Sequence, residues 1–209
     1  MYGIDIDGVV ANFSHGFSLL LYTLDGKDRL PIVENNDCRS WDWNEWYAQD
    51  EISRSELRML IERAWEEHIK IRGNVLWNTL SPLFPDAMEA LNKHAGKHPV
   101  MFITRRDGPG AWQETVSCLH RYGVDYPLVY VCKAGEEKSD ICHRMRIDTI
   151  IDDSPKYAQE LLDNDIQVIM PRWRYNKSFR TINFTNEKLL PVGNLEDALR
   201  TADILERGD

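Results

Sequence analysis

The sequence predicts a doubly wound α/β fold, in which a parallel β-sheet is covered by helices on both faces. Short apolar segments alternate along the chain with segments that have the periodicity of amphipathic helices. The apolar segments are continuous, which is typical of strands that are buried on both faces of a parallel sheet. Strand and helix signals that follow one another in this way indicate successive β-α-β units.

The predicted strands are spread along the whole chain. The first lies at 2–10, where the apolar run is interrupted by Asp5 and Asp7. Continuous apolar runs predict further strands at 99–104, 128–132, 149–152 and 166–170. In an open parallel sheet, ligands bind at the carboxyl ends of the strands. Polar residues at the ends of these runs are therefore the candidates for a functional site.

Helical segments are predicted between the strands. Segment 85–95 begins with a proline and is followed by a glycine, which are the usual residues at the two ends of a helix. Segment 111–122 is also followed by a glycine. Its Trp112, Val116 and Leu119 share one side, so we expect an amphipathic helix with these residues on its apolar face.

Three more helices are expected in the second half of the chain. Lys138 opens a helix that precedes the strand at 149–152. Ser154 is a suitable N-cap, and Pro155 suits the first position of the helix that follows. Asn194 is the expected cap of a last helix that runs through Leu205. The predicted helices alternate with the strands, as the fold class requires.

Residues 13–80 interrupt the alternation and are expected to form a small, mainly helical cap. Ser53 and Glu56 have the spacing of a capping box at the start of a helix. The segment holds most of the chain's seven tryptophans, namely Trp41, Trp43, Trp46, Trp65 and Trp77. The simplest role of these side chains is to form the core of the cap. We therefore expect an α/β core at 1–12 and 81–209, with a cap at 13–80.

Asp5 and Asp7 form the first candidate catalytic group. Carboxylates two residues apart point to the same side of an extended chain. Like charges so placed repel one another unless a cation or a functional role compensates. Gly8 then permits a sharp exit from the strand. The apolar residues on both sides of the pair indicate that it is buried.

A hydroxyl and cationic side chains form the next candidate groups. Thr104 ends the predicted strand at 99–104, and Arg105 follows it directly. A hydroxyl with backbone N–H groups at a strand end can bind a phosphate, and arginine adds positive charge. Lys138 is the candidate lysine further along the chain, with Lys133 as the alternative. A solvated surface lysine is an equally simple interpretation of either.

Asp152 and Asp153 end the predicted strand at 149–152. Adjacent carboxylates at a strand end, before a capped helix, are typical of a site that holds a metal ion. Hard oxygen ligands of this kind suit Mg²⁺. The sequence therefore predicts a magnesium site that includes these residues.

The order of these groups along the chain is more specific than any single group. It resembles the four motifs of the haloacid dehalogenase-like superfamily of phosphotransferases, here Asp5-Ile-Asp7, Thr104, Lys138 and Asp152-Asp153. Phospho-receiver domains use similar residue types. They place the acidic pair early and the phosphorylated acid in mid-chain, so the order in this sequence differs from theirs.

Within the superfamily, the sequence is similar to the 5′(3′)-deoxyribonucleotidase group. That group also has a helical cap between its first two motifs, and an aromatic residue eight positions after the nucleophile, here Phe13. The segment 81–85 resembles the approach to its second motif, and 152–155 resembles its fourth. The likeness runs from residue 1 to 174. The sequence departs from the group at Arg105, where the group often has serine.

The resemblance implies a role for each motif residue. Asp5 would attack phosphorus and form an aspartyl-phosphate. Asp7 would protonate the leaving alkoxide and then take a proton from water. Thr104 and Lys138 would bind the phosphoryl oxygens. The implied Mg²⁺ ligands are the Asp5 carboxylate, the Asp7 backbone carbonyl and the Asp153 carboxylate, with Asp152 behind them or bound through water.

The cap would cover the site, and its aromatic residues would select the substrate. Phe13, Trp41 and Trp43 are the candidates to stack on a nucleobase, and Arg105 is the candidate to shape substrate preference. The expected activity is Mg²⁺-dependent hydrolysis of nucleoside monophosphates. Two alternatives remain open: the same chemistry on a polynucleotide 3′-phosphate or a small phosphorylated metabolite, and a non-catalytic binding protein on the same scaffold.

Composition limits the partners. The 209-residue chain is 43% hydrophobic and 28% charged, which excludes a disordered chain, and its net charge of −9 does not favour stable binding to nucleic acid. No apolar run approaches the length of a membrane helix, and no leader pattern opens the chain. We expect a cytoplasmic protein with reduced, buried thiols. The aromatic cap could also make a homodimer contact.

Overall fold

The central sheet has six parallel strands in the order β3-β2-β1-β4-β5-β6, in agreement with the predicted doubly wound fold. The structure is a computed structural model and describes residues 1–35, 38, 52–71, 76–77 and 79–207. The strands are β1 (Tyr2–Ile4), β2 (Val100–Thr104), β3 (Leu128–Val131), β4 (Thr149–Ile151), β5 (Gln167–Pro171) and β6 (Leu189–Val192). The strand order reverses beside β1, and the reversal places the end of β1 between the ends of β2 and β4.

The expected extent of the first strand was wrong, and one strand was not predicted. β1 ends at Ile4, because the following segment curls into a loop in which the Ile6 carbonyl accepts hydrogen bonds from Val10 N and Ala11 N, both at 2.8 Å. The sequence also gave no indication of β6, which contains Pro191. Proline removes one hydrogen-bond donor, and β6 tolerates it because it is an edge strand.

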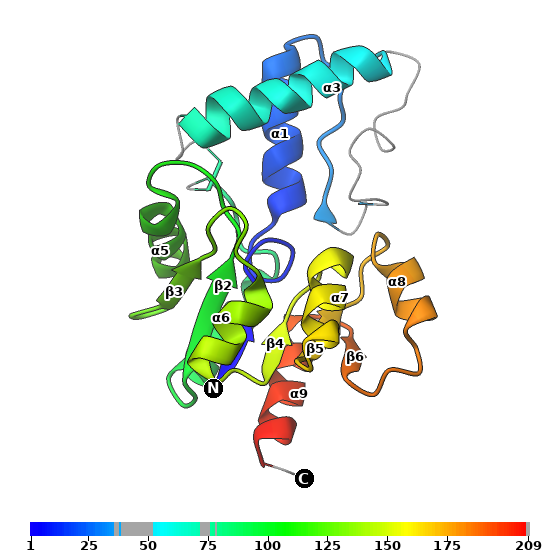
Figure 1. Cartoon of the computed structure of the whole chain (residues 1–209). Coiled ribbons are helices and arrows are strands. Elements are labelled where there is room, and N and C mark those ends of the chain that lie inside the picture. Colours follow the sequence, from blue (N-terminus) through cyan, green and yellow to red (C-terminus); the bar gives the residue numbers. More distant parts are fainter. Residues whose placement is uncertain (36–37, 39–51, 72–75, 78, 208–209) are drawn as a thin grey trace.

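Alternate residues of β2, β4 and β5 enter two hydrophobic clusters on opposite faces of the sheet. In β2, Phe102 belongs to the cluster shared with α4 (Met88–Ala95), α5 (Ala111–Arg121) and α9 (Leu195–Arg207). Ile103 belongs to the cluster shared with α6 (Lys138–Met145) and α7 (Pro155–Asp163), which lie in front of the sheet in Figure 1. The two-residue period of a strand thus supplies both cores.

The described part of the predicted cap contains two helices above the carboxyl edge of the sheet (Figure 1). They are α1 (Phe13–Asp25) and α3 (Arg54–Arg63), and α3 continues into the π-helix η2 (Ala64–Ile71). The capping box at Ser53 and Glu56 is present. Buried residues of α1 and α3 join the same cluster as one face of the sheet.

The other predicted helices form with small shifts of their ends. A short 3₁₀ helix, η3 (Pro85–Ala87), precedes α4, and α8 (Lys177–Ile182) was not predicted. The expected apolar face of α5 needs one correction. Trp112 is half exposed, because the sheet-facing side of α5 consists of Ala111, Thr115, Cys118 and Leu119.

All four cysteines are buried and unbridged, as expected. Within the described ranges, no helix combines the length and the hydropathy that crossing a bilayer requires.

Candidate active site

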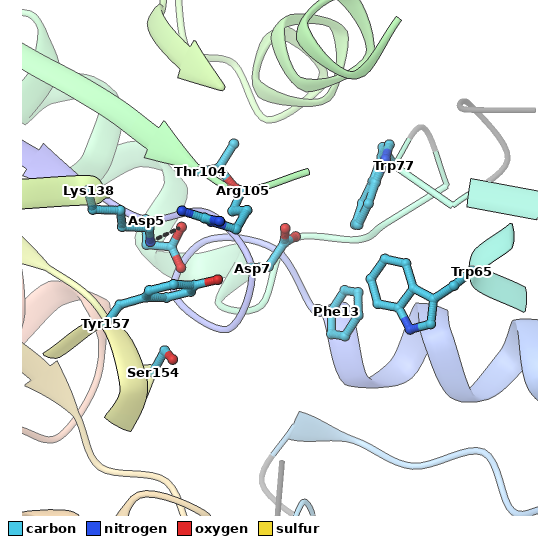
Figure 2. Close-up of a pocket in the computed structure, with 10 residues that line it drawn as sticks. All are labelled: Asp5, Asp7, Phe13, Trp65, Trp77, Thr104, Arg105, Lys138, Ser154 and Tyr157. Carbon is cyan, nitrogen blue, oxygen red and sulfur yellow. Dashed lines mark ion pairs between the residues drawn. The ribbon is translucent and has the colours of Figure 1, made fainter. Parts of the chain in front are cut away.

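The predicted motif residues meet at the carboxyl edge of the sheet. Asp5 follows β1, Thr104 is the last residue of β2, and Asp152 follows β4. These three strands are neighbours, so the topology alone brings the three positions together. Figure 2 shows Asp5, Thr104 and Lys138 grouped at one end of a pocket.

Three carboxylates form a buried cluster at this edge. Asp5, Asp152 and Asp153 each place an oxygen within 4.8 Å of the other two, and their exposed fractions are 6%, 0% and 0%. Lys138 Nζ lies 2.6 Å from Asp152 Oδ2 and 3.0 Å from Asp5 Oδ1. One cationic side chain thus faces three acids in the described part of the chain.

The electrostatics of the cluster show that this single cation does not balance it. The pKa of Asp5 is raised to about 7, mainly by burial and also by the charges of Asp152 and Asp7, against the opposing effect of Lys138. Burial, followed by the charges of Asp152 and Asp5, also raises the pKa of Asp153 well above its usual range. Burial opposes the charged form of Lys138, but Asp152 and Asp5 outweigh it and raise the pKa of that ammonium. The cluster would be stabilised by a further cation.

The oxygens of the cluster fit the predicted Mg²⁺ site. Asp152 Oδ1 accepts a hydrogen bond from Ser154 N at 2.9 Å, and its Oδ2 accepts one from Lys138. Asp153 Oδ2 accepts a hydrogen bond from the Tyr175 hydroxyl. Asp153 Oδ1, in contrast, is buried and has no hydrogen-bond partner among the described residues. Asp153 thus has a free oxygen for a metal ion, whereas both oxygens of Asp152 are engaged.

Gly8 is essential to this arrangement. Its φ of +82° lies in the left-handed region, and an added Cβ would stand 2.2 Å from Asp153 Oδ2. Its carbonyl accepts a hydrogen bond from Trp173 Nε1 at 2.9 Å. The loop after β1 therefore lies directly against Asp153 only because residue 8 has no side chain.

Asp7 lies apart from the acidic cluster and is held by Arg106. Arg106 Nε and Nη2 donate to Asp7 Oδ2 and Oδ1 at 2.9 and 2.6 Å. Arg106 is 2% exposed, donates from Nη1 to Thr115 Oγ1 at 3.1 Å, and stacks on Trp77 at 4.9 Å from the ring centre. This pairing was not predicted, since the sequence indicated only added positive charge near Thr104.

The pocket has a volume of about 300 Å³. It is lined by Asp5, Asp7, Phe13, Trp65, Trp77, Thr104, Arg105, Lys138, Ser154 and Tyr157. Lys138 lies at this pocket, whereas the alternative Lys133 is exposed outside it. Trp41 and Trp43, two of the predicted stacking residues, lie outside the described residues.

The pocket has a charged end and an aromatic end, with Asp7 between them (Figure 2). Phe13 stacks with Trp77 at a ring-centre distance of 6.0 Å and with Trp65 at 6.4 Å. Of these aromatic residues only Phe13 was singled out from the sequence. Trp65 was difficult to distinguish in advance, because a tryptophan at helical spacing is equally suited to a core.

Arg105 and Tyr157 form the wall beside the charged end. The guanidinium of Arg105 lies 5.6 Å from the centre of the Tyr157 ring, and Lys138 Nζ lies 4.7 Å from it. Arg105 Nη2 donates to the Glu136 carbonyl, while its Nε is buried without a hydrogen-bond partner among the described residues. The resemblance led us to expect Arg105 at the pocket, but nothing in the sequence indicated Tyr157.

Known structures share this architecture. A haloacid dehalogenase family hydrolase from Deinococcus radiodurans R1, with bound phosphate and sodium, aligns over 99% of this chain and 95% of its own, at a TM-score of 0.61 and 12% identity. The fold is that of the haloacid dehalogenase-like hydrolases. A hydrolase of this family from Xanthomonas campestris aligns over 99% and 96%, at a TM-score of 0.58 and 12% identity.

The haloacid dehalogenase-like fold also occurs with other chemistry. An L-2-haloacid dehalogenase aligns over 96% of this chain and 98% of its own, at a TM-score of 0.52 and 14% identity. No protein-family model and no curated protein matches the sequence. At these identities the likeness establishes the fold, so the activity has to be argued from the site itself.

Proposed function

We propose that this chain is a Mg²⁺-dependent phosphomonoesterase that hydrolyses nucleoside monophosphates through an aspartyl-phosphate on Asp5. The observation that carries the proposal is the arrangement in the pocket. A buried nucleophilic carboxylate lies beside Lys138 and Thr104, a second acid lies in mid-pocket, and an aromatic wall lies beyond it. The charged end suits the phosphate of a nucleoside monophosphate, Asp7 suits its ester oxygen, and the aromatic wall suits its base.

The first step takes place at Asp5. An Asp5 oxygen attacks phosphorus, the bond from phosphorus to the ester oxygen breaks, and the leaving alkoxide takes a proton. Lys138 and the Thr104 hydroxyl bind the phosphoryl oxygens and offset their charge. Phosphate esters resist hydrolysis mainly because their anionic oxygens repel a nucleophile, so these two residues lower the main barrier.

Asp7 supplies the proton and later recovers it from water. In the second step water attacks phosphorus, its proton passes to Asp7, and the bond from phosphorus to Asp5 breaks. In the present structure both Asp7 oxygens accept hydrogen bonds from Arg106. Each carboxylate oxygen has a second lone pair, so Arg106 can hold Asp7 in place while one oxygen carries the proton toward the leaving group. The presence of this second acid favours a phosphatase, since dehalogenase relatives lack it.

The acidic cluster would hold the Mg²⁺ ion. Asp5 and Asp153 are the proposed carboxylate ligands, with the Asp7 backbone carbonyl beside them and Asp152 acting through Lys138 and bound water. When bound, the ion neutralises phosphate charge and orients the ester for in-line attack.

The aromatic end of the pocket supports a nucleotide substrate. Stacking of a base on an aromatic side chain is worth about 1–3 kcal/mol. Phe13, Trp65 and Trp77 offer such a surface, and the volume of about 300 Å³ lies at the lower limit of small-molecule sites. We propose that segment 13–80 acts as the cap that places these residues over the substrate. The net charge of −9 does not favour a polynucleotide substrate.

The test measures phosphate release from a substrate panel. It contains deoxyribonucleoside and ribonucleoside 5′- and 3′-monophosphates, ribose 5-phosphate and a 3′-phosphorylated oligonucleotide, each with Mg²⁺ and with a chelator. We expect Mg²⁺-dependent release that is fastest from the mononucleotides. Asp5→Asn should abolish release, whereas Asp125→Asn, which changes an exposed aspartate, should not.

Other outcomes would correct specific parts of the proposal. Release from ribose 5-phosphate or the oligonucleotide alone would keep the mechanism and exclude the substrate class. Release that persists in Asp5→Asn would contradict the assigned nucleophile. A folded protein that releases nothing from the panel would favour a non-catalytic binding role.

A further inference from the structure

A second cluster of metal-binding side chains lies at the opposite edge of the sheet from the candidate active site. His94 is in the last turn of α4, and His98 lies two positions before the first residue of β2. Asp203 and Glu206 are on α9, which lies far from α1 and α3 in Figure 1. Nothing in the proposed phosphatase chemistry uses these residues.

The backbone places the two imidazoles together. His98 N donates to the His94 carbonyl at 3.0 Å, so the chain makes a further helical turn after α4. The rings stack at a centre-to-centre distance of 4.7 Å. Two histidines separated by three residues have a spacing that is common in zinc sites.

The donor atoms have the separations of a metal-binding set. Asp203 Oδ1 lies 3.1 Å from His94 Nδ1 and 3.2 Å from His98 Nε2. The three residues each place one donor atom within 4.8 Å of the others. Around a tetrahedral zinc ion with ligands ~2.0–2.1 Å away, neighbouring donor atoms are ~3.3 Å apart. Both separations from Asp203 Oδ1 match that spacing.

The contacts to Asp203 Oδ1 are short but are not aligned as hydrogen bonds usually are. No described residue donates a hydrogen bond to Asp203 Oδ1, although two imidazole nitrogens lie within 3.2 Å of it. In a metal site the lone pair of each donor atom is directed at the ion. Neighbouring donor atoms are therefore close together but are not aligned for hydrogen bonding with one another. The His94 ring is also 6% exposed, and its Nε2 has no hydrogen-bond partner in the described part of the chain.

Glu206 provides a supporting contact. Its Oε2 lies 2.7 Å from His98 Nδ1, the nitrogen that does not face Asp203. A carboxylate behind a ligating histidine fixes the orientation of the ring and increases the basicity of the other nitrogen. This contact leaves His98 Nε2 directed toward Asp203.

We propose that His94, His98 and Asp203 bind a zinc ion that joins the turn before β2 to α9. Imidazole with one carboxylate suits Zn²⁺, whereas the all-oxygen cluster at Asp5, Asp152 and Asp153 suits Mg²⁺. The chain would therefore have two metal sites of different chemistry at opposite edges of one sheet. This inference does not depend on the proposed phosphatase activity.

Isothermal titration calorimetry tests the proposal. Zinc is titrated into the tag-free protein in the presence of excess Mg²⁺. We expect one tightly bound Zn²⁺ per chain, and a melting temperature that rises as zinc is added. His98→Gln and Asp203→Asn should each weaken binding at least about tenfold. Asp203→Asn keeps the shape of the side chain. Its zinc affinity therefore still tests the proposal if His98→Gln lowers the stability of the fold.

The controls separate this site from the rest of the molecule. His120→Gln changes an exposed histidine on α5, and Asp153→Asn changes the acidic cluster. Both should bind the zinc ion with unchanged affinity. The proposal is wrong if the wild type binds no zinc. It is also wrong if zinc binding survives Asp203→Asn and His98→Gln, or is lost in Asp153→Asn.

Discussion

Arg106 donates two parallel hydrogen bonds to the carboxylate of Asp7, from Nε at 2.9 Å and from Nη2 at 2.6 Å. The two residues belong to loops that follow neighbouring strands, β2 and β1. Only arginine presents donors in a planar fork that matches a carboxylate. The orientation of the second acid of the site is thus set by a buried side chain outside the four sequence motifs.

Arg106→Lys should separate this positioning role from simple charge. Lysine keeps the charge but loses the fork, so we expect kcat to fall by roughly 100-fold through misplacement of Asp7, with a smaller change in KM. Loss of the forked hydrogen bonds should also lower the free energy of unfolding by about 1–3 kcal/mol. Steady-state kinetics and urea unfolding give the two numbers. Arg58→Lys, at an ion-paired arginine that is 75% exposed, should change neither much.

The stability of the metal-free protein should depend on pH through Asp5. The pKa of Asp5 is about 7 in the folded protein and near 3.8 in the unfolded chain. Between these values the folded state binds the proton more tightly, so stability falls as pH rises from about 4 to about 7, by at most about 4 kcal/mol. Below this range both states are protonated, and the penalty disappears.

Urea unfolding with a chelator at several pH values measures this dependence. Asp5→Asn should show a smaller loss of stability across the same range, because asparagine does not titrate. Adding Mg²⁺ to the wild type should also reduce the loss, because the ion balances the buried charge. Equal slopes in the wild type and Asp5→Asn would show that Asp5 does not cause the effect.

Gly8→Ala should disturb the site through contact with Asp153. Gly8 and Gly135 have nearly the same φ, +82° and +81°, but only at Gly8 would a Cβ meet a neighbour, at 2.2 Å. Gly135→Ala therefore controls for backbone strain, which costs about 1–2 kcal/mol. We expect Gly8→Ala to lose more stability and to bind Mg²⁺ about 10–100-fold more weakly. Calorimetric titration compares the two variants, and equal Mg²⁺ affinity would refute the prediction.

Trp65→Ala should weaken the binding of nucleotides and leave simpler phosphate esters unaffected. Loss of one stacking surface costs about 1–3 kcal/mol, which corresponds to a rise in KM of about 5–150-fold for a mononucleotide. KM for ribose 5-phosphate should change little, because that substrate has no base. Trp112→Ala, at a half-exposed tryptophan of α5 outside the pocket, is the control. A similar rise for both substrates would indicate a structural role for Trp65.

The sequence was sufficient to predict the parallel sheet and the edge at which the site lies. Continuous apolar runs required burial on both faces, and acids at the ends of the runs marked the carboxyl edge. The order of Asp5, Thr104, Lys138 and Asp153 along the chain resembles that of the family motifs, and this resemblance was enough to propose the chemistry. β6 was missed because Pro191 is tolerated only at an edge, and strand order is not encoded locally.

The tertiary structure alone decided which side chains meet. Arg106 contacts Asp7 across 99 positions of sequence, and Asp203 of α9 lies 3.1 Å from His94 of α4, although α4 is in the middle of the chain and α9 is near its end. Neither pair has a local signal, because each depends on the packing of elements that the chain connects by long crossovers. The sequence by itself determined the fold class and the candidate catalytic groups. The packing of the helices and strands decided which side chains the catalytic groups contact. Such contacts depend on position in space and not on separation along the chain.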